Sequence, residues 1–307
     1  MVELSYTIHL CDKYLYSREG CFFMSEGLLT DKQTEEVIRF LKEKTLTKAF
    51  KLGLNSDRKP SIFDSKVGGI PYFPSNMDIP KNSEGYSLTL LAQLNMADFE
   101  GSDILPQKGM LQFYISGDDL YGADFDNPCS SESSRVIYHS EINKSITEKE
   151  VAERFSKVKE ECDEEFFPHE GEFAIDVTPQ ETFIGPEDYR FEKIFTEALK
   201  IVGIDEKEIE ENGFFEYIDY DNKEFRIGQG HWVLGYPFFT QYDPRDNNAE
   251  YEKFDTLLFQ LDSESDKPES GKWKVLWGDC GVGNFFINSD DLKKLDFSNV
   301  MYNWDCC

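Results

Sequence analysis

Short apolar runs that are bounded by Gly, Asn, Asp or Ser form the main pattern along the chain. Four of these runs occupy residues 88–95, 109–119, 255–262 and 281–291. Runs of this length with turn residues at both ends are typical of β-strands. The pattern therefore predicts two regions of mainly antiparallel β-structure, one in each half of the chain.

Helical patterns lie outside these regions. Thr30, Thr147 and Asp205 are each followed three residues later by Gln or Glu, which is the capping-box arrangement at a helix start. A further helix is predicted to begin at Pro186, because proline suits the first helical position, and to stop at Gly203. Helices are thus expected in the N-terminal segment and between the two β regions.

The apolar runs come in two matching sets. A Gly-x-Pro-aromatic-Phe block begins at Gly69 and again at Gly235. The same pattern of Thr, Leu and Gln follows at nearly the same spacing, ending in Gln93 and in Gln260. The next runs share Gly, Phe, Ile and two Asp in the same order. Three matching blocks in one order indicate an internal duplication of a single β unit.

The duplication predicts that residues 69–119 and 235–291 superpose about a pseudo-two-fold axis. The second copy carries an additional polar loop, 263–272, of a kind that surface loops tolerate at small cost. The expected fold class is α+β, because strands and helices do not alternate within a copy as a doubly wound fold requires. The expected organisation of the single chain 1–307 is an N-terminal helical segment at 1–47, a first β repeat at 48–120, a helical acidic connector at 121–212 and a second β repeat at 213–307.

The net charge of the chain argues against two classes of function. The chain has 60 Asp and Glu against 32 Lys and Arg, a formal net charge of −28. Binding to nucleic acid needs a basic face, and electrostatic attachment to a membrane needs a basic cluster, so neither is expected. The 26 Phe, 15 Tyr and 4 Trp supply enough apolar surface for a core despite this charge.

The compartment predicted from the sequence is the cytoplasm. Residues 1–10 lack the basic and apolar regions of a secretory signal, and no apolar run approaches the ~20 residues that span a bilayer. The seven cysteines are scattered without a C-x-x-C pair, which fits a reducing compartment and gives no zinc site.

Several blocks together resemble one known family, the YwqG-like family of bacterial proteins. The resemblance extends over roughly positions 48 to 307 and implies a mainly β architecture. The family is a domain of unknown function, so the resemblance supplies no catalytic residue, no cofactor and no partner. The blocks that carry the resemblance are 65–71, 90–95, 109–113, 235–237, 257–262, 277–281 and 305–307.

Gln93 and Gln260 are the first candidate site residues. Each is a polar side chain inside an apolar strand, and a buried amide must find hydrogen-bond partners. One interpretation is that each amide holds the backbone of a neighbouring loop. The other is that both line a groove between the two repeats and contact a polar ligand.

His231, Asp262 and Asp279 complete the candidates. Brought together, one imidazole and two carboxylates can hold a divalent metal or serve acid–base chemistry. The chain lacks an H-E-x-x-H motif, and Asp279 stands in a Gly-Asp-Cys-Gly sequence typical of a tight turn. We therefore expect no metal, no cofactor and no catalytic residue, and we retain all five side chains as ligand-binding candidates.

The oxygen-rich stretch 118–127 raises the question of calcium, but its spacing departs from that of the EF-hand loop. The function expected first is a non-enzymatic, acidic binding protein that captures a basic partner, for example an immunity-type protein that neutralises a basic toxin or enzyme. The alternative is a small-ligand-binding or hydrolytic enzyme with its site between the repeats. A third interpretation is that the charge serves only to keep the protein in solution.

Overall fold

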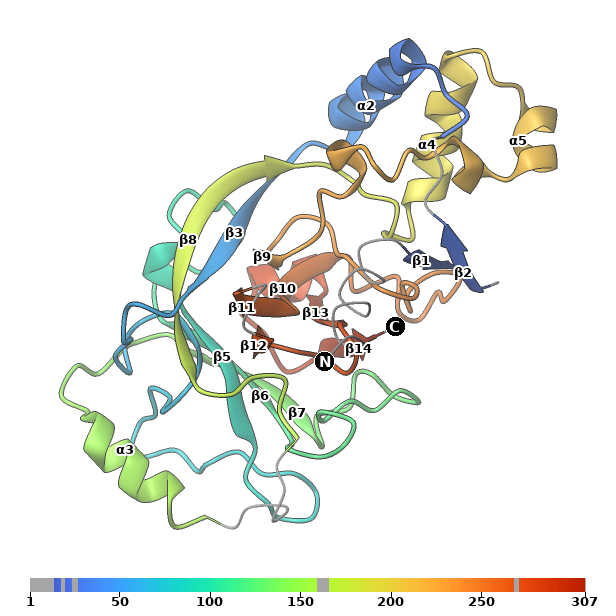
Figure 1. Cartoon of the computed structure of the whole chain (residues 1–307). Coiled ribbons are helices and arrows are strands. Elements are labelled where there is room, and N and C mark those ends of the chain that lie inside the picture. Colours follow the sequence, from blue (N-terminus) through green and yellow to red (C-terminus); the bar gives the residue numbers. More distant parts are fainter. Residues whose placement is uncertain (1–13, 18–19, 24–26, 159–165, 268–270, 307) are drawn as a thin grey trace.

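The computed structural model describes residues 14–17, 20–23, 27–158, 166–267 and 271–306. Residues 1–10, from which the absence of a secretory signal was predicted, lie outside these ranges. The chain is built around one ten-stranded sheet that curls into a nearly closed barrel (Figure 1). In spatial order its strands are β14 (Val300–Asp305), β13 (Val282–Ile287), β10 (Thr256–Asp262), β9 (His231–Val233), β3 (Thr47–Asn55), β8 (Glu172–Thr182), β4 (Lys66–Gly68), β5 (Thr89–Asn95), β6 (Met110–Ile115) and β7 (Ser134–His139).

Every neighbouring pair in this sheet is antiparallel. The mainly antiparallel β-structure predicted from the apolar runs is therefore confirmed. Aromatic side chains from distant parts of the chain meet inside the barrel. The ring of Phe113 on β6 lies 4.6 Å from that of Phe259 on β10 and 4.9 Å from that of Phe285 on β13. Burying these rings together stabilises the curled sheet.

The two edge strands of the sheet, β7 and β14, face each other across a seam. Among the described residues the seam is bridged by the loop 117–133, which joins β6 to β7. The backbone N–H of Tyr302 donates to the carbonyl of Pro128 (2.7 Å), and the Tyr302 hydroxyl donates to the carbonyl of Tyr121 (2.9 Å). These hydrogen bonds hold β14 beside the loop that leads into β7, although among the described residues β7 and β14 are not joined by a ladder of backbone hydrogen bonds.

The two halves of the sheet pair in similar ways. β5 and β10 each contain a β-bulge against their partner strand, after Leu90 and after Leu257. Beyond the bulge, Gln93 lies opposite Gln112 and Gln260 lies opposite Asn284. At the centre of the sheet β3 pairs with β8, so each half begins next to this long pair.

The helices form two separate groups (Figure 1). α2 (Asp31–Thr45) packs with α4 (Phe191–Ile201) and α5 (Glu206–Asn212) around a second apolar core, whereas α3 (Glu148–Phe155) packs near Phe73. The three predicted capping boxes are present at the starts of α2, α3 and α5. Within the described ranges, no helix is both long and apolar enough to cross a membrane.

One helix begins later than predicted. α4 starts at Phe191 and not at Pro186. The intervening residues form turns in which the N–H of Asp188 donates to the carbonyl of Gly185, and the N–H of Phe191 donates to that of Asp188. The Asp188 carboxylate also holds the Arg190 guanidinium at 2.6 and 2.7 Å, which keeps these residues in place before the helix.

Strands also occur where the sequence predicted helix or loop. β7 and β8 lie in the segment 121–212, and the polar loop 263–272 contains most of a hairpin of β11 (Glu264–Lys267) and β12 (Lys272–Val275). A second hairpin, β1 (Tyr14–Ser17) with β2 (Gly20–Phe23), lies in the segment 1–47. The hairpin strands are short, and β8 pairs with the distant strands β3 and β4. The remaining short elements are η1 (Met96–Asp98), η2 (Phe214–Tyr217), η3 (Lys223–Phe225) and α6 (Ser289–Lys293).

A buried ion-pair network lies where the loop before α4 meets the barrel. The Arg245 side chain is fully buried and binds the Asp243 carboxylate through Nε (2.9 Å) and Nη2 (2.6 Å). Its guanidinium also lies 4.0 Å from the centre of the Phe286 ring on β13. The backbone N–H of Tyr189 donates to Asp243, so the network ties the two parts of the chain together.

Candidate functional site

The Gln93 amide is buried and hydrogen-bonded to backbone groups of a neighbouring loop. Its oxygen accepts from the N–H of Tyr72 (2.8 Å), and its nitrogen donates to the carbonyls of Ile62 (3.0 Å) and Asp64 (2.8 Å). The Gln112 nitrogen donates to the same amide oxygen at 3.2 Å. Because every polar atom of Gln93 has a partner, the side chain holds this loop against β5.

Gln260 makes the corresponding set of bonds in the other half of the sheet. Its oxygen accepts from the N–H of Phe238 (2.8 Å), and its nitrogen donates to the carbonyls of Gly228 (2.8 Å) and Gly230 (2.7 Å). The nearby Asn284 nitrogen donates to the carbonyl of Phe238. Each glutamine thus contacts the loop of its own half.

His231 and Asp262 are brought together by the pairing of β9 with β10. The Nδ1 atom of His231 accepts a hydrogen bond from the N–H of Asp262 (3.0 Å), so the ring proton sits on Nε2. Nε2 donates it to the Glu264 carboxylate at 2.8 Å. The imidazole is therefore held at both nitrogens.

The Asp262 carboxylate is buried beside this imidazole. It accepts from the N–H groups of Gly230 and Ser263, both at 2.8 Å. Burial raises the pKa of Asp262 to about 6, although the neighbouring His231 and the two backbone hydrogen bonds oppose the rise. Asp262 therefore titrates near pH 6, and its carboxylate accepts hydrogen bonds from the backbone on both sides of the β9–β10 pair.

Glu264 and Lys274 join this cluster, although the sequence did not mark them. The Lys274 ammonium bonds Glu264 (2.5 Å) and the carbonyl of Leu54 on β3 (2.8 Å). Burial alone would raise the pKa of Glu264, but hydrogen bonds from His231 and Lys274 hold it below its ordinary value. The cluster fastens the β11–β12 hairpin to β9 and β3. The alternation of charged and apolar residues at 272–275 is a sequence signal that could have indicated this hairpin, which was predicted as a polar loop.

Asp279 lies outside the β9–β10 pair. It is exposed, in the turn between β12 and β13. The neighbouring Gly278 packs against Cys306 and the indole of Trp304 on β14, so tightly that a Cβ atom there would lie 2.7 Å from the Cys306 sulfur. The turn that carries Asp279 therefore faces β14 and the loop 117–133.

That loop and the end of β14 form an acidic aromatic face, a term we use for residues 118–126, Asp279 and Trp304. The loop 117–133 contains five carboxylates and no Lys, Arg or His. Leu120 and Phe125 are exposed at their tips, with 45% and 54% of their surfaces accessible. The Trp304 indole donates to the carbonyl of Leu120 (2.7 Å), and its ring lies 6.0 Å from that of Phe125.

The aspartates of this face divide into two groups. Asp118 and Asp124 accept hydrogen bonds from backbone N–H groups two to four residues ahead, which shapes the loop. Asp119 and Asp126, like Asp124, are exposed. Among the described residues, no three His, Cys, Asp or Glu side chains gather closely enough to hold a metal ion. The stretch 118–127 is thus arranged as a charged surface loop.

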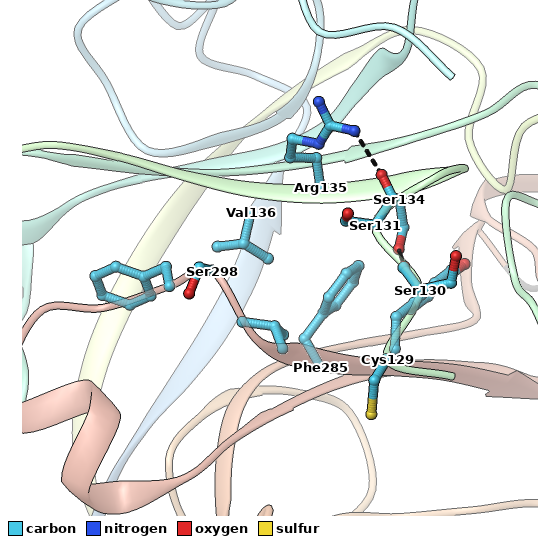
Figure 2. A pocket seen from close by; sticks show the side chains of 11 residues that line it. Cys129, Ser130, Ser131, Ser134, Arg135, Val136, Phe285 and Ser298 are labelled. Atoms are coloured by element: carbon cyan, nitrogen blue, oxygen red, sulfur yellow. Dashed lines mark hydrogen bonds between the residues drawn. The ribbon is translucent and has the colours of Figure 1, made fainter. Parts of the chain in front are cut away.

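A pocket of about 240 Å³ opens in the seam between β7 and β14 (Figure 2). Figure 2 shows Val136 pointing from β7 towards Phe285, with Cys129 and Ser130 along one side. The Arg135 guanidinium turns away and donates to the carbonyl of Ser131 (2.5 Å). The pocket has an apolar floor and a rim rich in serine, and it adjoins the acidic aromatic face. The predicted candidates do not line it.

The fold and this surface together define an antiparallel β-barrel protein with a strongly acidic face. A family model matches residues 65–306, and the chain belongs to that family, which is described as "Domain of unknown function (DUF1963)". No curated protein matches the chain significantly.

Proposed function

We propose that this protein is a non-enzymatic binding protein that captures a basic segment of a partner protein on its acidic aromatic face. The observation that carries the proposal is the loop 117–133, which joins five carboxylates and no cation to two exposed apolar tips, Leu120 and Phe125. One concrete form of this function is the neutralisation of a basic toxin or enzyme.

Electrostatics support this assignment. A net charge of −28 attracts cationic partners over distances longer than a hydrogen bond and speeds their encounter. The carboxylates of the face also act on a side chain beside it. Burial raises the pKa of the Tyr251 hydroxyl, and the charges of Glu250, Asp124 and Asp126 raise it further. Cationic side chains are stabilised at the same place.

Apolar groups at the face supply contact area and aromatic ring faces, which charge alone does not provide. Phe125, Tyr121 and Trp304 form one aromatic group, with the Tyr121 and Trp304 ring centres 4.8 Å apart. Aromatic side chains attract Lys and Arg through their ring faces and provide contact area at an interface. The Trp304 indole is already fixed by its hydrogen bond to Leu120, so its side chain loses little conformational entropy on binding.

The architecture behind this surface is, we infer, the product of a duplication with a pseudo-two-fold axis between β3 and β8. The matched bulges in β5 and β10 and the matched bonds of Gln93 and Gln260 support this inference. The YwqG-like resemblance is consistent with it, and we propose a bacterial, cytoplasmic protein. The enzyme alternative lacks comparable support, because the glutamine amides bond the chain's own backbone and Asp279 is exposed whereas His231 is buried.

Neutralising part of the face tests the function. We compare the wild type with the triple variant Asp119→Asn, Asp124→Asn, Asp126→Asn by titration with a fluorescent peptide of twelve residues rich in Lys and Arg. A control triple variant, Glu206→Gln, Glu210→Gln, Glu211→Gln, makes the same change of net charge on the exposed surface of α5. A Glu-rich peptide of the same length controls for peptide binding without charge complementarity.

The face variant is expected to bind the basic peptide about 10-fold more weakly, since three exposed charge contacts contribute about 0.5 kcal/mol each. The control variant stays within about twofold of wild type, and 0.5 M salt weakens wild-type binding strongly. Equal losses in both variants would mean that net charge alone matters. That outcome, or no binding of the basic peptide to wild type, overturns the proposal.

A further inference from the structure

We propose that the seam pocket between β7 and β14 receives an aromatic side chain of the basic segment, which anchors that segment beside the acidic aromatic face. This inference rests on the proposed function and specifies the chemistry of the partner: an aromatic residue flanked by Lys or Arg. The pocket and the face adjoin, since Tyr302 lines the pocket and its hydroxyl donates to the carbonyl of Tyr121 in the face (2.9 Å).

The pocket exists because the barrel closes incompletely. β7 and β14 are the outer strands of the sheet, and the bond from the Tyr302 N–H to the carbonyl of Pro128 occupies part of the β14 edge. Side chains at the rim are small, chiefly serines such as Ser131 and Ser298, and they do not fill the space between the edges. The opening is therefore built into the closure of the sheet.

The volume suits a single ring. A protein cavity of about 150 Å³ lined by apolar side chains accommodates benzene. At about 240 Å³, the seam pocket accommodates the ring of Phe or Tyr with its connecting methylene, whereas small-molecule sites usually exceed 300 Å³. A side chain that enters from a bound segment fits these dimensions better than a larger free ligand.

The floor is chemically suited to a ring. Phe285 is stacked on Tyr302, with ring centres 4.5 Å apart and planes inclined by 13°, and it also contacts Phe113 in the barrel core. A further ring placed against Phe285 and Val136 extends this aromatic column. The floor residues are held by the core, so the pocket is preorganised for its occupant.

Charges around the pocket favour a cationic segment over an anionic one. The carboxylates of Asp124, Asp126 and Glu250 are close enough to act on Tyr251, and that of Glu250 also acts on Cys129 at the pocket. Two cations are also near: Arg135 is tied to the Ser131 carbonyl, and Lys253 lies 5.1 Å over the Phe254 ring. Basic residues on either side of the anchor therefore face the carboxylates of the loop 117–133.

The test uses two basic peptides of identical charge that differ only at the central residue, Phe in one and Ala in the other. Each is titrated into the full-length wild type and into two variants that fill the pocket, Val136→Trp at its wall and Ser298→Trp at its exposed rim. Thermal unfolding shows whether each variant is folded, and the rim substitution places no new bulk in the core. Binding of fluorobenzene, followed by fluorine NMR, reports on the pocket independently of the peptides.

Wild type is expected to bind the Phe peptide about 10-fold more tightly than the Ala peptide, because burial of one aromatic side chain contributes free energy of that size. In each folded variant that preference falls to twofold or less, while the Ala peptide binds as before, and fluorobenzene no longer binds. If wild type binds both peptides equally, or the preference survives in both variants, the anchor is wrong and the proposed function stands. If fluorobenzene binds but the Phe peptide gains nothing, the pocket takes a free small aromatic instead, and the inference is again overturned. If neither peptide binds, the proposed function itself is wrong.

Discussion

Replacing Gln260 by Met measures how much one buried amide contributes to the fold. Met has nearly the shape of Gln but lacks its polar atoms. The variant leaves three backbone groups without their partner, the N–H of Phe238 and the carbonyls of Gly228 and Gly230. Each buried group left unpaired costs about 1–3 kcal/mol. We expect a total loss of about 3–6 kcal/mol, since water reaches the part-buried groups.

Gln93→Met provides the matched measurement in the other half of the sheet, because it also removes three bonds to backbone groups. Gln180→Met on β8 is the control, since Gln180 is exposed and changes to such residues usually alter stability by about 0.5 kcal/mol or less. The free energy of unfolding is measured in urea by tryptophan fluorescence. Comparable losses for the two buried positions are expected.

A loss below about 1 kcal/mol for either buried glutamine would refute this reasoning, because even one unsatisfied buried group costs that much. It would also mean that the amide is free to serve a ligand, as the alternative interpretation of the sequence proposed. A large loss at one position and a small loss at the other would contradict the proposed duplication.

Two further predictions concern buried charge. Arg245→Met takes the guanidinium from the buried carboxylates of Asp243 (2.6 Å) and Asp188 (3.6 Å) and is expected to cost about 3–5 kcal/mol in urea unfolding. Arg190→Met is expected to cost less, because Asp188 then keeps Arg245; equal costs would contradict this. Burial and the charge of Asp262 raise the pKa of Asp305 to about 7. The folded protein therefore holds a proton that the unfolded chain releases near pH ~4, and this contribution to stability declines as pH rises from ~4 to ~7. Asp305→Asn has no carboxyl to titrate and lacks this decline. The free energy of unfolding of the variant, relative to that of wild type, is therefore expected to increase over that pH range and then level off. A stability difference that is independent of pH would exclude this role for Asp305.

The features that were predictable from sequence are those that depend on neighbouring residues. The capping boxes at Thr30, Thr147 and Asp205 act within one helical turn, and all three are present. The apolar runs around Gln93 and Gln260 also indicated strands correctly, because apolar runs bounded by turn residues act locally.

Features that depend on distant partners escaped prediction. β8 is exposed over much of its length and polar at its end, and it is a strand because β3 and β4 pair with it. Glu264 belongs to the buried cluster because it bonds His231, 33 residues away. The seam pocket forms where β7 lies beside β14. No spacing along the chain encodes such contacts.

The pairing at the centre of the sheet constrains how the chain can fold during its synthesis. β3 emerges from the ribosome before β4, yet its two neighbours in the sheet are β8 and β9. β4 likewise needs β8 as a neighbour. One edge of β3 therefore stays unpaired until Val233 has been translated. A nascent chain halted before that point is the form of this protein most in need of a chaperone.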